Sequence, residues 1–329
     1  MKKYGNVVLF LILILVPVLA GCSGGNGGGG NSGGGGYTGV AFTMVPVPTV
    51  TNFPIGTDDN TDNPGSVTNP YYIAQTEVTY ELWKAVYDWA TDPARANRYY
   101  FQNAGVEGSM GTVGADPTTA NNQHPVTNVS WRDAMVWCNA LTEYYAAKGG
   151  TSLACVYTYN GATVRDSRDS NVTACDSVAA NIAANGFRLP TGNEWELAAR
   201  YISATKFYPG NYASGADAAC NATATADYDG DNYKHNTSDV AVYDNSSTAA
   251  VKSKSPNKLG LYDMSGNVWE WCFDLHGDND GIPLREVRGE SWHYFDIMNE
   301  YQYLQLGFKD ICNSDWFDSE IGFRPVRTQ

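Results

Sequence analysis

Residues 257–273 read NKLGLYDMSGNVWEWCF, a turn-rich half followed by a short apolar run from Val268 to Phe273. Gly, Asn and Asp favour turns, and an apolar run of this length suits a single strand. Much of the chain has the same make-up, with abundant Gly, Asn, Asp and Thr around short apolar runs such as Val40 to Val47. The pattern predicts many loops and short strands.

Three segments have helical spacing instead. Thr79 to Ala90 begins with a capping residue and then places apolar side chains three or four residues apart. Ser130-Trp131-Arg132-Asp133 and Thr191-Gly192-Asn193-Glu194 each fit a capping box, in which the first side chain and the fourth satisfy each other's backbone N–H. We therefore expect a loop-rich α+β domain with a few short helices. Ser203 to Ser255 has little apolar content and is expected to be a long surface excursion.

The N-terminus has the make-up of a targeting segment. Lys2 and Lys3 precede an apolar run, Val7 to Leu19, that is short for a membrane span. The run ends in Leu19-Ala20-Gly21-Cys22, which resembles the bacterial lipobox. We expect residues 1–21 to be a lipoprotein signal peptide, Cys22 to carry the lipid, and the Gly-rich residues 22–36 to form a flexible tether. An ordinary secreted protein with a chance Cys is the alternative.

The charge of the chain excludes some partners. A formal net charge of −14 argues against nucleic acid and against electrostatic adhesion to anionic lipid. Contact with a membrane would then depend on the lipid at Cys22. The expected location is the bacterial cell surface, as an outer-membrane lipoprotein. We expect a monomer.

Six cysteines follow Cys22, and no two have zinc-like or Cys-x-x-Cys spacing. Because disulfides are permitted outside the cytoplasm, Cys155 and Cys175 are predicted to form one, flanking the hairpin-like residues 156–161. Cys138 lies on the apolar face of the second predicted helix and is predicted to be a buried free thiol.

Seven motifs in the same order resemble the formylglycine-generating enzyme, or sulfatase-modifying factor, domain. The resemblance covers residues 37–329 and implies an elaborated C-type lectin fold. The motifs are MVPVP (44–48), YIAQTEVT (72–79), HPVTNVSW (124–131), GFRLPTGNEWELAAR (186–200), NKLGLYDMSGNVWEW (257–271), RGESW (288–292) and GFR (322–324).

The resemblance also implies where catalysis would occur. Members that oxidise a cysteine use two Cys separated by four residues, between the sixth of these motifs and the last. Here that interval contains only Cys312, and Leu306 takes the place of the second family Cys. A single Cys provides neither a redox pair nor a metal-binding thiolate pair. We therefore expect no enzyme activity and no redox cofactor. A formylglycine-generating oxidoreductase that acts on sulfatase cysteines is the alternative.

A second family feature is a calcium site. By position, the resemblance implies side-chain ligands from Asp263 and Glu270 and backbone ligands from Gly266 and Val268, which are hard oxygen ligands of the kind calcium prefers. The alternative is that both carboxylates are ordinary turn and surface residues. Asp227 to Asp231 resembles part of an EF-hand but lacks the Glu at position twelve, so we expect a solvated loop.

The interval from His293 to Glu320 is rich in Tyr, Trp and Phe together with Asp, Asn and Ser, without a helical or strand period. Such side chains are typical of a binding surface, although an aromatic tail can also be core. The interval is similar to the C-terminal region of lectin-fold proteins diversified by retroelements, in which Asn codons are randomised. We expect a variable region at about 286–325 in which several residues contact a protein or other surface ligand, with aromatic anchors at Tyr294, Phe295, Trp316 and Phe317. The predicted contacts are His293, Tyr294, Phe295, Asp296, Asn299, Asp310, Ile311, Asn313, Trp316, Phe317 and Ser319. The Glu-Pro-Asn and Gln-Pro-Asp triplets of calcium-dependent sugar binders are absent.

Overall fold

The structure is a computed structural model that describes residues 37–293 and 300–329. The predicted signal peptide, Cys22 and the tether lie outside the described residues. Within those two ranges, no helix is both long enough and apolar enough to cross a bilayer.

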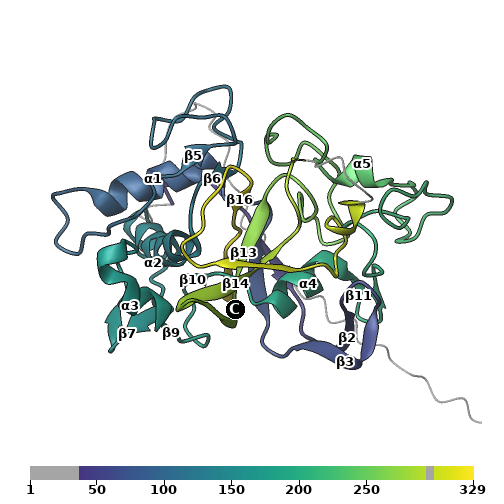
Figure 1. Ribbon diagram of the computed structural model, residues 1–329, viewed down its shortest axis with the longest axis horizontal. Helices are drawn as coiled ribbons and strands as arrows, with labels where there is room; N and C mark the ends of the chain where they lie inside the picture. The colour runs from purple at the N-terminus through teal and green to yellow at the C-terminus, as the bar shows by residue number, and fades with distance from the viewer. Residues whose placement is uncertain (1–36, 294–299) are drawn as a thin grey trace, which may run out of the picture. The chain divides into compact units, whose positions relative to one another are not determined.

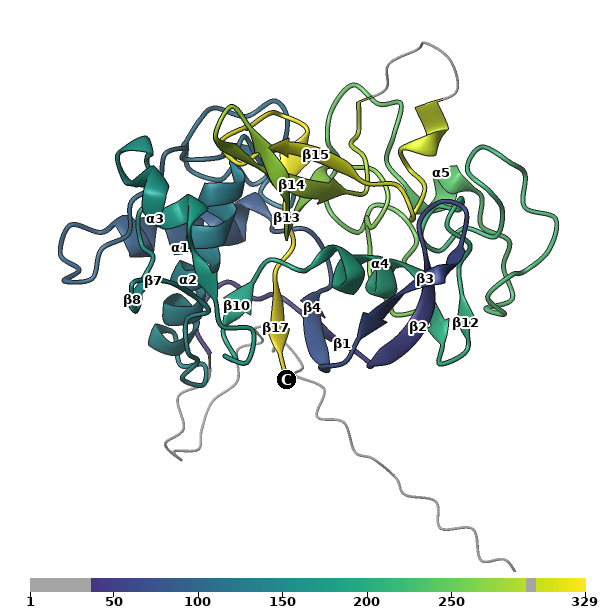
Figure 2. The ribbon, with the colours of Figure 1, turned by 60° about the horizontal axis from the view of Figure 1, so that its bottom comes forward.

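One antiparallel sheet joins the two ends of the described chain. Its strand order is β1-β4-β17-β10, so the first strand of the chain, β1, and the last, β17, both pair with β4 (Figure 2). Val326 pairs with Ile73, and both side chains are fully buried. The strands are β1 (Met44–Val47), β4 (Tyr71–Ala74), β17 (Val326–Thr328) and β10 (Phe187–Arg188).

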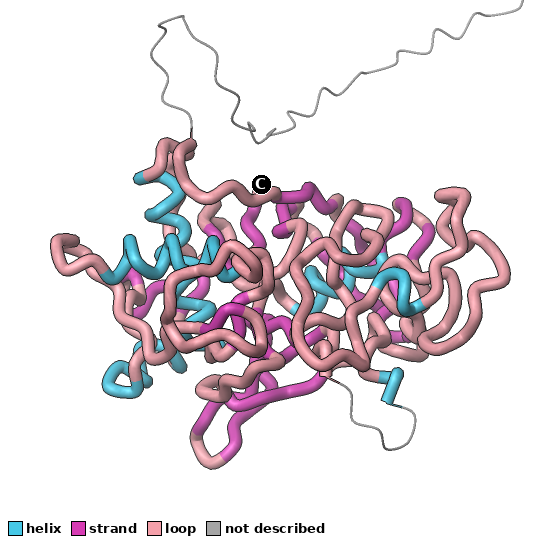
Figure 3. Tube along the Cα trace, turned by 90° about the horizontal axis from the view of Figure 1, so that it is seen from above, coloured by secondary structure: helices cyan, strands magenta, loops and turns pink. Residues whose placement is uncertain are grey.

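A second sheet, in the order β15-β14-β13-β16, carries the C-terminal interval. β13 (Trp269–Asn279) and β14 (Ile282–Arg288) form a long hairpin that turns at Asp280 and Gly281, both with positive φ. β15 (Asp310–Asn313) pairs antiparallel with β14, and β16 (Ile321–Gly322) pairs parallel with β13. The chain after β14 therefore returns to both outer edges of its own hairpin, which projects from the rest of the fold in Figure 3.

The three predicted helices are confirmed. α1 (Tyr80–Thr91) is capped by Thr79, and α2 (Trp131–Ala147) and α4 (Gly192–Arg200) begin with the predicted capping boxes at Ser130 and Thr191. The short helices are η1 (Asp169–Asn171), α3 (Val172–Asp176), α5 (Thr237–Val240) and η2 (Glu300–Gln302). The other strands are β2 (Val50–Ile55), β3 (Asn60–Val67), β5 (Val106–Glu107), β6 (Val126–Thr127), β7 (Tyr157–Tyr159), β8 (Ala162–Thr163), β9 (Ala179–Ala180), β11 (Tyr201–Ser203) and β12 (Lys206–Phe207). Loops connect most of them (Figures 1 and 3), so the predicted loop-rich α+β class is confirmed.

Two apolar clusters form most of the core. In the first, under α1 and α2, Trp83 and Trp137 stack with ring centroids 5.7 Å apart, and Phe323 meets Trp137 edge-on at 5.3 Å. The second lies under α4 and includes Trp195 and Leu306. Phe323 belongs to the last motif, so the end of the C-terminal interval is held by a fully buried aromatic group.

Two sequence predictions are wrong. Cys155 and Cys175 are both free: the Cys175 thiol donates to the carbonyl of Asp166 (3.2 Å), and that of Cys155 lies 3.6 Å from the carbonyl of Asn139. The interval of residues 203–255 is not only a surface excursion, because Ala213, Ala216 and Val240 form a small buried cluster there. The prediction of a buried free Cys138 is confirmed.

Candidate functional site

The two ends of the C-terminal interval are hydrogen-bonded to each other. The indole N–H of Trp292 donates to the carbonyl of Ser319 (3.2 Å), and the Ser291 hydroxyl donates to Glu320 (2.9 Å). The imidazole Nδ1 of His293 lies 2.8 Å from the other Glu320 oxygen. The fold therefore closes the interval into a loop whose base is held by the framework motifs.

Side chains in the second half of this loop point into solvent. Ile311, Trp316 and Phe317 are 42, 54 and 50% exposed, and Asp310 is also exposed. His293, Asn313 and Ser319 are half-buried. Of the other predicted contacts, Tyr294, Phe295, Asp296 and Asn299 lie outside the described residues. A pair of exposed consecutive aromatic residues is uncommon enough to need an explanation, because such side chains are usually buried or engaged.

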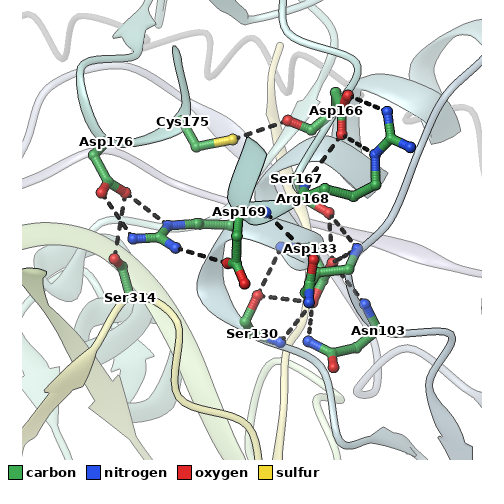
Figure 4. Close-up of polar contacts among 12 residues, drawn as sticks. Asn103, Ser130, Asp133, Asp166, Ser167, Arg168, Asp169, Cys175, Asp176 and Ser314 are labelled. Carbon is green, nitrogen blue, oxygen red and sulfur yellow. Dashed lines mark hydrogen bonds and ion pairs between the residues drawn. The ribbon is translucent and has the colours of Figure 1, made fainter. Parts of the chain in front are cut away.

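The turn that carries Trp316 and Phe317 is fixed from below by Ser314, which is fully buried (Figure 4). The Ser314 N–H donates to the carbonyl of Pro283 (2.7 Å), and its hydroxyl donates to Asp176 (3.4 Å). Asp176 in turn accepts two bonds of 2.8 Å from the guanidinium of Arg132, which is itself almost completely buried. A two-pronged Arg–carboxylate pair is geometrically specific, so α2 and α3 define the position of this turn. Sequence analysis missed both Asp176 and Ser314.

The outer edge of β15 is partly closed by its own chain. The N–H of Ile311 donates to the Asp310 carboxylate (2.8 Å), and the carbonyl of Asn313 accepts from Trp316 (2.9 Å). Groups satisfied in this way are not open for pairing with a further strand. Binding at this surface would therefore depend on side chains.

The predicted calcium motif forms a tight turn at the centre of the molecule. Asp263, Gly266 and Asn267 all have positive φ, and a Cβ on Gly266 would lie 2.2 Å from the carbonyl oxygen of Val242. Only glycine fits there. Asp263 is buried; one of its carboxylate oxygens accepts from the Lys252 N–H (2.8 Å), and the other has no hydrogen bond.

Glu77, which sequence analysis missed although it lies in the second motif, faces the same place. It is buried, one oxygen accepts from Asn267 (3.3 Å), and the other has no hydrogen bond. Burial, with Asp263 as the next cause, raises the pKa of Glu77 well above its usual value, and burial raises the pKa of Asp263 to about 6. Two buried carboxyls with unsatisfied oxygens are the kind of environment that a cation relieves.

Glu270 makes a different set of contacts from those expected of a calcium ligand. Its two oxygens accept from the Arg324 Nε (3.0 and 2.9 Å), one also accepts from Arg324 Nη2 (2.6 Å), and the other from the Trp195 indole N–H (2.8 Å). All three side chains are buried. The Arg324 guanidinium therefore already balances the Glu270 charge, and its positive charge also acts on Glu77 and Asp263 without offsetting the rise that burial causes in their pKa values.

A second acidic group combines Asp227 and Asp229 of the predicted solvated loop with the buried Asp217. Single carboxylate oxygens of Asp217, Asp227 and Asp229 lie within 4.8 Å of one another. Asp217 accepts from the N–H groups of Tyr228 and His235 (2.7 Å each), and Asp227 accepts from three N–H groups of its own loop. These bonds account for the clustering without an ion.

The thiols are not activated. Cys312, the single cysteine of the C-terminal interval, is half-buried against the first core cluster, and burial raises its pKa to about 11. Burial also raises the pKa of Cys272 well above its usual value. A thiol with a raised pKa stays protonated at neutral pH and is a poor nucleophile or metal ligand.

These features can be compared with known proteins. The family model described as the sulfatase-modifying factor enzyme 1-like domain matches residues 43–329. The chain belongs to this family. The family resemblance of the seven motifs is thus confirmed, as is the C-type-lectin-like, loop-rich α+β fold.

Three relatives show how varied the family is. The chain is 27% identical over 275 residues to a protein of Paenibacillus barcinonensis named chaperone protein LppX, covering 79% of this chain and 80% of that one. It is 33% identical over 118 residues to inactive C-alpha-formylglycine-generating enzyme 2 of Mus musculus, covering 36% of this chain and 35% of that one. The solved structure of Treponema denticola variable protein 1 superposes with a TM-score of 0.59 at 29% identity, covering 89% of this chain and 98% of that one. Relatives of this chain therefore include an inactive member and a variable protein.

Proposed function

We propose that this protein is a non-catalytic, surface-displayed lipoprotein that binds ligands through its C-terminal loop. The observation that carries the proposal is the exposure of Trp316 and Phe317 on a turn held by the buried Ser314. A rigid backbone with exposed aromatic side chains loses little entropy on binding and supplies large contact area. The similarity to Treponema denticola variable protein 1 supports the proposal that side chains in this loop are exchangeable.

The state of the cysteines favours binding over oxidation. Between Arg288 and Arg324 the sequence has only Cys312, and its raised pKa keeps the thiol protonated. Oxidation of a substrate cysteine needs a reactive thiolate or a metal bound by thiolates. We therefore infer that the family's sulfur chemistry has been lost here, while the framework that surrounded it is retained.

The remaining parts of the proposal concern anchoring and the cation site. A lipid at Cys22 and the Gly-rich tether of residues 22–36 would hold a monomeric domain at the outer membrane. A calcium ion would be held by Asp263 with backbone oxygens of Gly266 and Val268, and by Glu77 rather than by the Arg324-bound oxygens of Glu270. The unsatisfied oxygens of Asp263 and Glu77 support this change in the ligand set.

A selection experiment tests the binding proposal. A phage-displayed library of random peptides is selected against the full chain, and the enriched peptides are measured against the Trp316→Ser/Phe317→Ser variant. We expect this variant to weaken binding by at least about thirtyfold, because two central aromatic anchors are removed. Leu275→Ser is the matched control, since Leu275 is also an exposed apolar residue (59%) but belongs to the hairpin.

Two results would contradict the proposal. One is binding that survives loss of both aromatics, which would put the ligand site elsewhere. The other is conversion of cysteine to formylglycine when the full chain is incubated with a sulfatase-motif peptide, which would establish the oxidoreductase alternative.

A further inference from the structure

A cavity lies beside the C-terminal loop but is built from a different part of the chain. It has a volume of about 510 Å³ and is lined by residues of α5 and of the loop that follows. Its lining includes Ser238, Tyr243, Asp244, Asn245 and Lys254. Pockets of this size commonly hold small ligands. None of these residues belongs to the predicted variable region.

Both flanks of the first half of the C-terminal loop contact this cavity wall. The N–H of Asn245 donates to the carbonyl of Trp292 (3.0 Å), and the ring of Tyr301 meets that of Tyr243 edge-on with centroids 6.0 Å apart. Figures 1 and 2 show η2, which contains Tyr301, beside α5. The cavity is thus a neighbour of the proposed ligand loop, on a wall that the framework supplies.

In the described part of the chain, the lining presents several polar groups without a hydrogen-bond partner. Among the described residues, no hydrogen bond involves the hydroxyl of Tyr243, the carboxylate of Asp244 or the amide nitrogen of Asn245. Burial raises the pKa of Tyr243, so its hydroxyl remains a donor at neutral pH. Donors and acceptors are therefore both available on the same lining as the Tyr243 ring.

The charges favour a neutral ligand. Asp244 is the one carboxylate of the lining and Lys254 the one ammonium, and the latter donates to the carbonyl of Ser238 (2.8 Å). The two formal charges cancel, so the lining as a whole has no net charge to select an anion or a cation. The lining also contains no β-strand, so an extended peptide has no edge to pair with.

We propose that the cavity of residues 238–254 binds a neutral saccharide unit, with the Tyr243 ring against the sugar and Asp244 and Asn245 bonded to its hydroxyls. This inference rests on the proposed function, because the cavity would act together with the proposed binding residues Trp316 and Phe317. A glycosylated partner would then be held by its sugar at the cavity and by its protein surface at Trp316 and Phe317.

The test uses titration calorimetry of the full chain with three related sugars. N-acetylglucosamine is neutral, glucosamine is cationic and glucuronate is anionic. We expect N-acetylglucosamine to bind at least about fivefold more tightly than either charged sugar, and Asp244→Asn to weaken it by about tenfold through loss of a charged hydrogen-bond acceptor. Asp280→Asn is the matched control, because Asp244 and Asp280 are both exposed and have similar positive φ values of 48° and 51°.

Tyr243→Phe gives a second measurement that keeps the ring contact with Tyr301 and removes only the hydroxyl; we expect a smaller loss, of about fivefold. The proposal is overturned if none of the three sugars binds, if a charged sugar binds most tightly, or if Asp244→Asn and Asp280→Asn behave alike. Binding of short unstructured peptides at these residues in place of sugars would also overturn it. Failure of the binding proposal is distinguishable, because Trp316→Ser/Phe317→Ser would then leave peptide binding intact whatever the sugars do.

Discussion

Arg324 and Trp316 belong to the same C-terminal stretch and have opposite environments. Arg324 is completely buried, bonded to Glu270 and to the carbonyls of Ala74 and Tyr262, whereas Trp316 is 54% exposed. Arg324 is hydrogen-bonded to three parts of the chain that are distant from it in sequence, whereas the backbone N–H of Trp316 donates to the nearby Asn313. Their difference teaches that the framework and the loop it carries can change independently, provided that the loop's own anchor at Ser314 stays in place.

Replacing Arg324 should have the largest effect. Arg324→Ala leaves Glu270 buried without its cation, next to two further buried carboxyls, and should lower the free energy of unfolding by about 3–5 kcal/mol. Denaturant unfolding measures this. Arg168→Ala is the matched control, because Arg168 makes a two-bond pair with Asp166 at the surface, and it should leave the unfolding midpoint unchanged. Equal effects of the two substitutions would remove the distinction between framework and surface.

The pH dependence of stability should be the next largest effect. Because the pKa of Asp263 is raised from 3.8 to about 6 in the folded protein, the folded state binds this proton more tightly than the unfolded state. The stabilisation that the protonated Asp263 contributes is fully present below pH 3.8 and is lost as the pH rises through about 6. The loss in the free energy of unfolding is at most about 3 kcal/mol. The raised pKa of Glu77 acts in the same direction at higher pH.

Urea unfolding in calcium-free buffer across this pH range measures the loss, and Asp263→Asn should flatten the curve. Calcium added at neutral pH should raise the unfolding midpoint of the unaltered chain but not that of Asp263→Asn. The assignment of these carboxyls would be contradicted if the stability of the unaltered chain rose between pH 4 and 6. It would also be contradicted if the stability of Asp263→Asn fell over this range by the same amount as that of the unaltered chain.

Removing the Ser314 hydroxyl should have a smaller and more local effect. Ser314→Ala loses its bond to Asp176 and should cost about 1 kcal/mol. Amide hydrogen exchange should become faster in residues 313–319 and remain unchanged in α2. Ser319→Ala, which removes a hydroxyl bonded only to the adjacent Asp318, is the control. Faster exchange throughout the molecule would mean that Ser314 supports the core rather than the turn.

Substitutions at Trp316 and Phe317 should have the smallest effect on stability, although they should have the largest effect on ligand binding. Trp316→Ser and Phe317→Ser should each change the free energy of unfolding by no more than about 0.5 kcal/mol, because both side chains lie at the surface with about half of their area exposed. Thermal unfolding checks this directly. A loss of several degrees would place the two aromatics in the core and refute the view of the turn as a presented surface.

Local patterns predicted the helices well because a capping box specifies a helix start without reference to anything distant. Ser130 and Thr191 are examples, and both helices begin where the sequence indicated. The prediction of a Cys155–Cys175 disulfide was wrong because a disulfide depends on tertiary geometry rather than on neighbouring residues. Spacing along the chain says nothing about where two thiols point, and here each is directed at a different backbone carbonyl.

The candidate site was predictable only in part. Composition indicated a binding surface between His293 and Glu320, and Trp316 and Phe317 are exposed as a surface requires. Nothing in the composition separated them from Leu304 and Leu306, which are buried in the same stretch. Exposure depends on which side of β14 the returning chain packs against, and that is decided by contacts with distant residues such as Asp176.

The sequence alone determined the family, the loop-rich α+β class, the helix starts and the absence of a second cysteine in the C-terminal interval, since each is recorded in neighbouring residues. Only the tertiary structure decided that Glu270 is bound to Arg324, that Glu77 faces Asp263, and that Ser314 is an anchor between exposed side chains. Those facts join residues up to 190 positions apart, as in the bond of Glu77 to Asn267, and depend on burial, which no local pattern specifies.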